Sequence, residues 1–251
     1  MAAVGTSFGE EGRRLSYGSY LKIPELLRLQ QRLTEAHDEL LFIIVHQAYE
    51  LWFRELIHEL EAVRDRMLAG EVFWVRHFLN RVRVVWRLLI EQVNVLETMS
   101  PQDFLAFRSE LAPASGFQSV QFREVEFLSG LKQPSYVKRI ECTPEEHERL
   151  LRRLEEPSLW DAYKALLGQH GSPSLEEVFA RRDLHGDLFD VAEGLLDHDE
   201  SFALWRSRHV LMVERQIGSK TGTGGSTGAQ YLRGTLDKRC FPELWEMRSR
   251  L

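Results

Sequence analysis

Cysteine, proline and long apolar runs are all scarce in this sequence of 251 residues. Its two cysteines, Cys142 and Cys240, lie far apart and form no CxxC pair, which argues against a thiolate zinc site. Few thiols in a chain of this length are typical of a reducing compartment, so we expect a cytoplasmic protein. The longest apolar run, residues 40–45, is too short to cross a bilayer, and residues 1–14 lack the apolar stretch of a signal peptide. We therefore expect no membrane partner.

Basic residues are not in excess either. Lys and Arg total 32 and Asp and Glu total 38, which gives a formal net charge of −6 at pH 7. This mild acidic balance argues against nucleic acid as a partner. Hydrophobic residues make up 43% and charged residues 28%, as in globular proteins, and the length suits one large domain. We expect a flexible segment over residues 1–16 and a single domain over 17–251.

Strand signals are rare, and almost every periodic segment has helical spacing. A pattern without glycine or proline extends from about 36 to 69, and Gly70 ends it. A second long pattern follows at once over 71–98, which predicts an antiparallel helical hairpin. The expected fold is all-α with a core of long helices. Further helices are expected at 102–109, 144–154, 158–169, 174–180, 185–196, 200–217 and 241–248.

Two histidines lie on apolar helical faces. His46 shares its face with Phe42, and His209 shares its face with Trp205. An axial haem ligand needs one imidazole held by a rigid helix in an apolar slot, with an acceptor for its other N–H. The alternative for both residues is an ordinary core histidine, and the spacing alone leaves this open.

Two loops and one arginine could complete a binding site. The glycine-rich loop at 218–228 fails the dinucleotide template, because Thr227 stands where G-x-G-x-x-G needs its last glycine. It is either a lid over a substrate or a disordered connector. Arg108, just before a loop at 113–119, could hold a carboxylate in a bidentate manner, or it could be a surface residue. Arg206 and Arg208, beside His209, could meet the two carboxylates of a haem.

A different class of enzyme is suggested by one short motif. Glu55 and His58 match the Glu-x-x-His half-motif of di-iron carboxylate bundles. That fold needs two such motifs and two further glutamates, and only one motif is present.

Taken in order along the chain, these segments resemble the tryptophan 2,3-dioxygenase family. The likeness extends from about Tyr17 to Leu244, so it covers nearly the whole chain. The matching segments are Tyr17-Gly-Ser-Tyr20-Leu21, residues 37–47 with Glu50-Leu-Trp52, Phe107-Arg108, Ser115-Gly-Phe-Gln-Ser119, Trp205-Arg-Ser-Arg-His209, Gly222-Thr-Gly-Gly-Ser226 and Phe241-Pro-Glu-Leu244.

The resemblance implies an all-α, long-helix bundle of the tryptophan/indoleamine dioxygenase type, with a haem pocket between helices. The cofactor would be haem b, with ferrous iron in the active form. Because the chain has no CxxCH motif, the haem would not be attached through one. His209 would be the proximal iron ligand, and Ser115 and Gly116 would lie at the haem edge.

The same resemblance implies a site for L-tryptophan. His46 would be the distal catalytic histidine that accepts the indole N–H, and Arg108 would hold the substrate carboxylate. Family members are homotetramers with intertwined N-termini, so some contacts would come from a neighbouring subunit. The other substrate-binding residues implied are Phe42, Phe104, Ser115 and Thr223, with Tyr17, Tyr20 and Leu21 from the neighbour.

The implied reaction is the addition of O2 across the indole C2–C3 bond, giving N-formylkynurenine, the first step of the kynurenine pathway. Two departures leave room for other readings. Phe104 stands where several bacterial relatives carry tyrosine, and the segment over 169–197 is short. The alternative is therefore a relative that oxygenates a substituted tryptophan in secondary metabolism, with insertion of one oxygen atom. A haem sensor or carrier without turnover is a third reading.

Overall fold

The computed structural model describes residues 15–225 and 227–251, and its regular elements within these ranges are all helices. The predicted all-α class is confirmed. None of the described helices combines the length and apolar character needed to cross a membrane. The flexible segment predicted over residues 1–16 lies almost wholly outside the described ranges.

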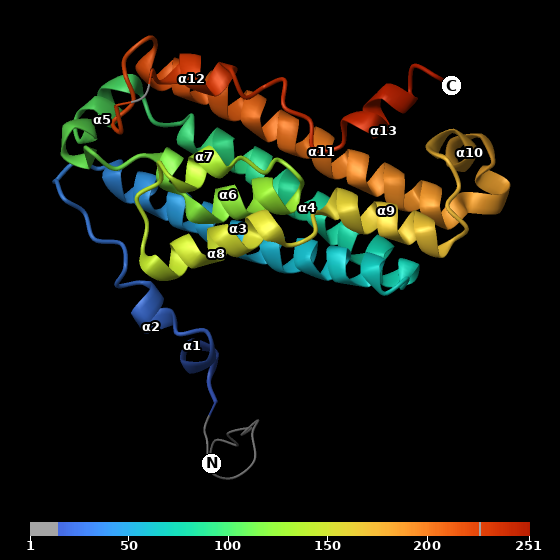
Figure 1. Ribbon diagram of the computed structural model, residues 1–251. Helices are drawn as coiled ribbons and strands as arrows, with labels where there is room; N and C mark the ends of the chain where they lie inside the picture. The colour runs from blue at the N-terminus through green and yellow to red at the C-terminus, as the bar shows by residue number, and fades with distance from the viewer. Residues whose placement is uncertain (1–14, 226) are drawn as a thin grey trace, which may run out of the picture.

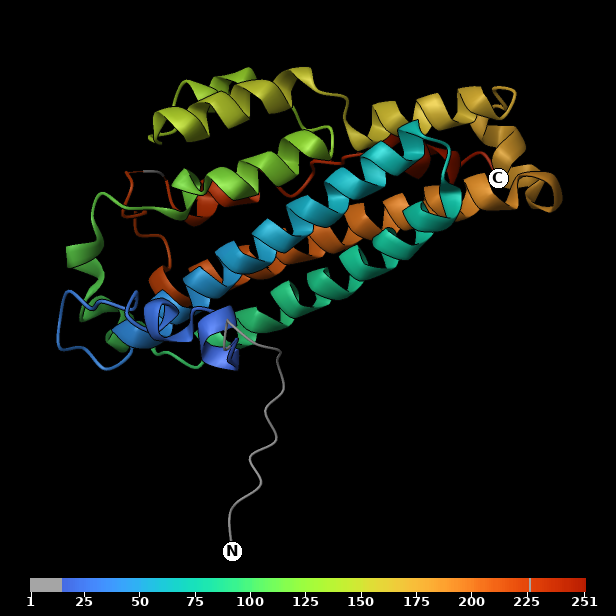
Figure 2. The ribbon, with the colours of Figure 1, turned by 90° about the horizontal axis from the view of Figure 1, so that it is seen from below.

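Three long helices form the core, and the middle one of them contacts both of the others. They are α3 (Glu39–Leu68), α4 (Val72–Leu96) and α11 (Arg182–Ile217), seen lengthwise in Figures 1 and 2. α3 and α4 form the predicted hairpin, and Gly70 makes the turn with a φ of 75°, which glycine adopts without strain. One face of α4 is buried along its whole length, from Val75 through Trp86 to Leu96. α4 therefore fixes the positions of α3 and α11.

α11 is one helix where the sequence predicts two, over 185–196 and 200–217. The polar run around residue 198 resembles a break, but His198 and Asp199 are buried. Trp86 Nε1 donates to His198 Nδ1 at 2.9 Å, and Asp199 accepts from the backbone N–H of Cys240 at 2.9 Å. Partners on other elements pair with His198 and with one oxygen of Asp199, so the helix continues. The only non-helical φ/ψ inside it is at His185.

The region after α4 also departs from prediction. The helix expected over 102–109 is divided into α5 (Pro101–Leu105) and a 3-10 turn, η1 (Arg108–Leu111). A second 3-10 turn, η2 (Gly116–Gln118), leads into α6 (Val120–Leu128), which the sequence does not predict. α6 buries charged residues and packs against α3.

Shorter helices cover the bundle and lead away from it. α9 packs on α3, α8 packs on α6, and α10 and α13 pack on α11. α1 and α2 extend beyond the bundle at the N-terminal end (Figure 1). The bounds are α1 (Tyr17–Tyr20), α2 (Ile23–Leu26), α7 (Pro134–Val137), α8 (Pro144–Glu155), α9 (Leu159–Gln169), α10 (Leu175–Ala180), α12 (Ala229–Arg233) and α13 (Pro242–Met247).

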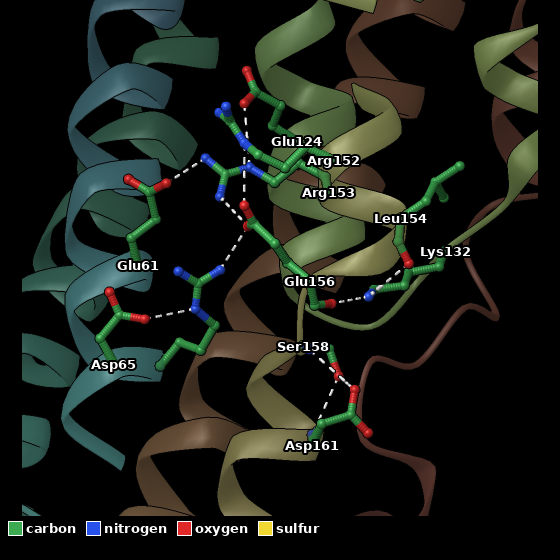
Figure 3. Close-up of polar contacts among 11 residues, drawn as sticks. Glu61, Asp65, Glu124, Lys132, Arg152, Arg153, Leu154, Glu156, Ser158 and Asp161 are labelled. Atoms are coloured by element: carbon green, nitrogen blue, oxygen red, sulfur yellow. Dashed lines mark hydrogen bonds and ion pairs between the residues drawn. The ribbon is translucent and has the colours of Figure 1, made fainter. Parts of the chain in front are cut away.

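An ion-pair network joins α8 to α3 and α6 (Figure 3). Arg153 is buried and contacts three carboxylates, those of Glu61, Glu124 and Glu156. Glu156 also accepts from Arg64 Nη1 at 2.8 Å. Because one buried guanidinium joins three elements, the network fixes the position of α8 against α3 and α6.

We expect Glu156→Gln to lower the free energy of unfolding at pH 7 by about 1–3 kcal/mol, the usual contribution of charged hydrogen bonds. Burial alone would raise the pKa of Glu156, but Arg64 and Arg153 lower it below 4.5. The stabilisation is therefore complete above about pH 4.5 and is lost as pH falls through the lower, folded-state pKa. Urea unfolding at pH 7 and pH 3 measures this. Glu155→Gln, at the exposed neighbouring position, is the control. A wild-type advantage that is equal at both pH values would contradict the prediction.

Candidate active site

A cavity of about 280 Å³ lies at one end of the bundle, where the N-terminal half of α3 faces the C-terminal half of α11. The remaining sides are lined by residues of α5, α6, η2, the 218–228 loop and α12. The predicted site residues that line this cavity are Phe42, His46, Phe104, Arg108, Ser115, Gly116, His209 and Thr223. The structure thus brings together residues from five separate stretches of the chain.

His46 projects from α3 with a defined tautomer. Its Nδ1 lies 2.7 Å from the carbonyl oxygen of Phe42 one turn earlier. A carbonyl can only accept, so Nδ1 carries the proton and Nε2 keeps its lone pair. Its position inside the protein lowers the pKa of His46, against the opposing influence of that hydrogen bond and of Glu50. The side chain is exposed, and it lines the cavity. A neutral imidazole with an acceptor nitrogen results.

His209 faces the same cavity from α11. Burial, and after it the charge of His46, lowers its pKa to about 4, so the ring is neutral at pH 7. Trp205, one turn earlier, stacks on it with a centroid distance of 5.1 Å and an interplanar angle of 6°. Among the described residues the imidazole makes no hydrogen bond, so the expected acceptor for its second N–H is not found. Stacking on Trp205, rather than a hydrogen bond, holds this ring.

Aromatic rings form the wall beside His46. The ring centroids of Phe42 and His46 are 4.0 Å apart, and Phe104 stacks on Phe42 at 5.7 Å. Phe107 is fully buried and meets both phenylalanines edge to face at 5.5 Å. Such offset and edge-on pairs fix ring positions more closely than aliphatic packing does. The wall therefore presents a preformed slot for a flat apolar group.

Arg108 and the glycine loop close one side of the cavity together. An Arg108 Nη2 N–H donates to the carbonyl oxygen of Thr221. Thr223 Oγ1 donates to the carbonyl oxygen of Ala114 at 2.6 Å. The described part of the loop is thus docked on the 113–119 segment, which favours a lid over a free connector. The Thr223 hydroxyl keeps its acceptor lone pairs.

Ser115 and Gly116 begin η2 at the cavity edge. Ser115 is the N-cap of this turn, and its Oγ accepts from the backbone N–H of Phe117 at 3.3 Å. Gly116 lines the cavity, and a Cβ added there would meet no protein atom within 4 Å. The backbone here leaves room for a ligand edge.

Tyr17, Tyr20 and Leu21 do not reach this cavity. They lie in and just after α1, and 78%, 69% and 42% of their respective surfaces are exposed. Their predicted place in a neighbouring subunit's site stays a prediction.

Two cavity-lining residues on α6, Arg123 and Glu126, were not foreseen. Charged residues at three of four consecutive positions in α6 are typical of a solvated surface, whereas these side chains are buried. Of the two arginines beside His209, Arg206 lines the cavity and Arg208 does not. Arg208 pairs instead with Glu97 on the side of α4.

The residues fit a haem better than a bare metal ion. His209 is neutral and has no hydrogen-bond partner within residues 15–225 and 227–251, the walls are aromatic, and Gly116 leaves space at the edge. In the described part of the chain, no group of three or more His, Cys, Asp or Glu side chains could hold a metal. The di-iron reading therefore lacks ligands, and His58 of its half-motif is exposed.

The long-helix all-α fold brings two neutral histidines and an arginine into one aromatic cavity, which is the class of helical protein expected from the sequence. The family model for tryptophan 2,3-dioxygenase matches residues 2–179 and 173–251. The chain belongs to the tryptophan 2,3-dioxygenase family. The two matched stretches meet inside the segment predicted to be short.

Curated relatives match over nearly the whole chain. A protein named tryptophan 2,3-dioxygenase from Nocardioides sp. is 53% identical, covering 98% of this chain and 98% of the relative. Proteins of the same name from Herpetosiphon aurantiacus and Caulobacter vibrioides are 43% and 40% identical, each covering 94% of this chain and 98% of the relative.

The docked loop generates a prediction at Gly224. A Cβ there would lie 2.6 Å from Ser115 Cβ and 3.1 Å from its Oγ, so Gly224→Ala should push the loop off the 113–119 segment. We expect trypsin to cleave after Lys220 at least about fivefold faster, because local opening exposes the site. The fragments are identified by mass spectrometry. Thr227→Ala, at an exposed position in the same loop, should leave the rate unchanged. Equal cleavage rates in Gly224→Ala and wild type would contradict the docked arrangement.

Proposed function

We propose that this protein is a haem-dependent dioxygenase that opens the indole ring of L-tryptophan with O2, yielding N-formylkynurenine as in the kynurenine pathway. The observation that carries the proposal is the placement of His46 and His209 in one aromatic cavity that Arg108 also lines. Family membership supports the reaction, because the curated relatives are named for it. The same names do not favour the alternative, a relative acting on a substituted tryptophan.

His209 would hold the iron of haem b through a ring nitrogen. Its depressed pKa keeps the imidazole neutral, which is the form that binds iron. Trp205 would fix the plane of the imidazole by stacking, and Ser115 and Gly116 would border the porphyrin. When bound, ferrous haem supplies O2 activation, which no side chain of this chain can provide.

The remaining residues would bind and orient tryptophan. Phe42 and Phe104 would sandwich or flank the indole in the aromatic slot, and the apolar walls would keep water out. His46 Nε2, the acceptor nitrogen of a neutral ring, would take the indole N–H hydrogen bond. Since an indole N–H is a very poor acid, an acceptor at this position suffices and a base is not required.

The zwitterionic end of the substrate needs charges of its own. The planar guanidinium of Arg108 can donate two parallel hydrogen bonds to a carboxylate. Thr223 has acceptor lone pairs for the ammonium group and comes from the loop that closes this side. Closure would therefore both orient the substrate and exclude solvent.

A neighbouring subunit would complete the site. Tyr17, Tyr20 and Leu21 expose apolar surface on an arm that extends from the bundle (Figure 1). Exposed aromatic side chains on an extended arm favour burial against another chain. We infer a homotetramer in which these residues reach a neighbour's cavity.

The product measures the function directly. Haem-loaded, reduced protein supplied with L-tryptophan and O2 should yield a product heavier than tryptophan by two oxygen atoms, with the absorbance of N-formylkynurenine. With 18O2, both atoms should carry the label. Gain of one atom would favour the substituted-tryptophan reading, and a haem spectrum with no turnover would favour a sensor or carrier.

His209→Ala tests the iron ligand in the same assay. Removing the imidazole should abolish stable haem binding, and product formation with it, while the helical circular dichroism signal is retained. A normal Soret band at full stoichiometry in this variant would refute His209 as the ligand.

Arg108→Ala should raise the KM for L-tryptophan far more than it changes haem binding. Loss of a charged hydrogen-bonding partner for the carboxylate should cost about 2–3 kcal/mol, or roughly 30- to 150-fold in kcat/KM. Steady-state kinetics and Soret titration of the same preparations separate the two effects. The control is Arg250→Ala. Arg250 is exposed, follows α13 and pairs with Glu176 on α10, so this variant should have the wild-type KM. An unchanged KM would remove Arg108 from the site.

A further inference from the structure

The arm that precedes α3, residues 15–35, is not held to the bundle by apolar packing. No residue in this range belongs to the hydrophobic core or packs against it. Three of its leucines, Leu27, Leu29 and Leu33, are exposed. A segment that buries little apolar surface is ordered only if other contacts offset the conformational entropy that it loses. The position of the arm therefore depends on its hydrogen bonds to α3.

Glu39, in the first turn of α3, makes the first attachment. Its Oε1 accepts from the backbone N–H of Leu33 at 2.6 Å, and its Oε2 accepts from the backbone N–H and the hydroxyl of Thr34 at 2.8 and 2.6 Å. The side chain is buried. Burial raises the pKa of Glu39, but the hydrogen bonds from Thr34 and Leu33 and the charge of Arg32 together bring it below 4.5. An ionised carboxylate thus holds two consecutive residues of the arm through strong, charge-assisted hydrogen bonds.

Gln47, further along α3, makes the second attachment. Its Nε2 donates to the carbonyl oxygen of Leu29 at 3.1 Å, and its Oε1 accepts from Gln30 Nε2 at 2.5 Å. Gln30 Nε2 also donates to the carbonyl oxygen of Leu26, the last residue of α2, at 3.0 Å. The helical rise places Glu39 and Gln47 about 12 Å apart along α3. Because the arm is fixed at two separate points, its direction is fixed as well as its position.

Glu39 and Gln47, here called the arm latch, lie on the turns of α3 that carry cavity residues. Gln47 directly follows His46, and Glu39 lies just under one turn before Phe42. Consecutive side chains of a helix point in directions roughly 100° apart, so His46 lines the cavity while Gln47 contacts the arm. The helix that forms one wall of a subunit's own cavity therefore also sets the course of its arm.

We propose that the arm latch positions each arm for the cavity of a neighbouring subunit, so that Glu39 and Gln47 act on a site in another chain. The inference rests on the proposed function, in which Tyr17, Tyr20 and Leu21 reach a neighbour's cavity. An arm whose direction is already fixed loses less conformational entropy on entering that cavity than a free arm does. Substitution of the latch should therefore impair the neighbour's site and leave the subunit's own cavity intact.

Glu39→Gln tests whether the latch holds the arm. An amide of the same shape turns an N–H toward one of the backbone N–H donors, so at least one hydrogen bond to a charged acceptor is lost. We expect trypsin to cleave the Arg32–Leu33 bond of the haem-free chain at least about tenfold faster, because the N–H that Glu39 holds belongs to this bond. The matched control is Glu25→Gln, at an exposed position within the arm, which should be cleaved at the wild-type rate.

Gln47→Ala provides a second variant in case Glu39→Gln does not fold, and circular dichroism verifies the fold of each. Loss of the Gln47 amide should expose the Arg28–Leu29 bond to trypsin in the same way, because this amide holds the Leu29 carbonyl. Cleavage at the wild-type rate in both variants would show that the latch does not hold the arm, and would overturn the inference.

A hybrid assembly tests whether the latch acts on a neighbour. Glu39→Gln and Arg108→Ala chains with different affinity tags are co-expressed, and assemblies that hold both are isolated by two affinity steps. The Glu39→Gln subunit keeps its own Arg108 and can receive a correctly held arm from its Arg108→Ala neighbour. We therefore expect a kcat/KM for L-tryptophan severalfold above that of either parent variant, with the same haem content per subunit.

A hybrid no more active than the mean of its parents would show that Glu39 acts within its own subunit, and would overturn the inference while the proposed function stands. If haem-loaded wild type yields no product, the proposed function fails. The trypsin rates and the mass of the haem-free assembly, measured by light scattering, then still test the latch, and a monomeric wild type would overturn it.

Discussion

The arrangement of the cavity depends on how α4 holds α3 and α11 apart. α4 packs against both helices, and the valines, leucines and tryptophan of its inner face are buried throughout. At the cavity end, large rings separate α3 from α11: Tyr49 and Phe53 meet Trp205 edge-on at 6.1 and 6.0 Å. The hydroxyl of Tyr49 also donates to the Leu89 carbonyl, which ties the spacing to α4. A cavity between two histidine-bearing helices follows from this spacing.

Rigid presentation of the two histidines has a chemical effect. Each sits on a helix of more than 25 residues with the preceding turn supplying its support: a carbonyl for His46 and an indole for His209. Both supports are one helical turn away, so they are built in whenever the helix forms. The burial that lowers both pKa values then keeps both rings neutral near pH 7. Neutral imidazoles are what metal ligation and hydrogen-bond acceptance require.

The sequence predicts most of this fold because the local signals agree with the tertiary structure. The hairpin of α3 and α4 follows from a long pattern without glycine or proline, interrupted once at Gly70. α6 and the continuity of α11 could not be predicted, for a common reason. Their charged and polar residues, such as Glu126 and Asp199, are buried against partners remote in sequence, and only the folded chain reveals those partners.

The site likewise combines residues that the sequence predicts with contacts that only the folded chain reveals. His46, His209 and Arg108 are predictable from their apolar settings and from resemblance, and the structure brings them to one cavity. Other features of the site are not predictable. The tautomer of His46 depends on a backbone carbonyl, and whether Arg206 or Arg208 lines the cavity depends on the face of the helix that each occupies. The two arginines are only two residues apart, yet Arg206 lines the cavity and Arg208 pairs with Glu97 at the end of α4. No spacing rule distinguishes them without the packing.

The contact between Arg108 and the Thr221 carbonyl links affinity to loop stability. The guanidinium that would hold a substrate carboxylate already serves the lid as a donor. A carboxylate that arrives must share this group or displace the carbonyl, so part of its binding free energy is offset by the lost loop contact. A change that strengthens the hydrogen bond from Arg108 to Thr221 would weaken carboxylate binding to the extent that the carboxylate displaces this carbonyl, and the converse would hold as well. Substrate affinity at this site would then depend partly on residues that do not touch the substrate.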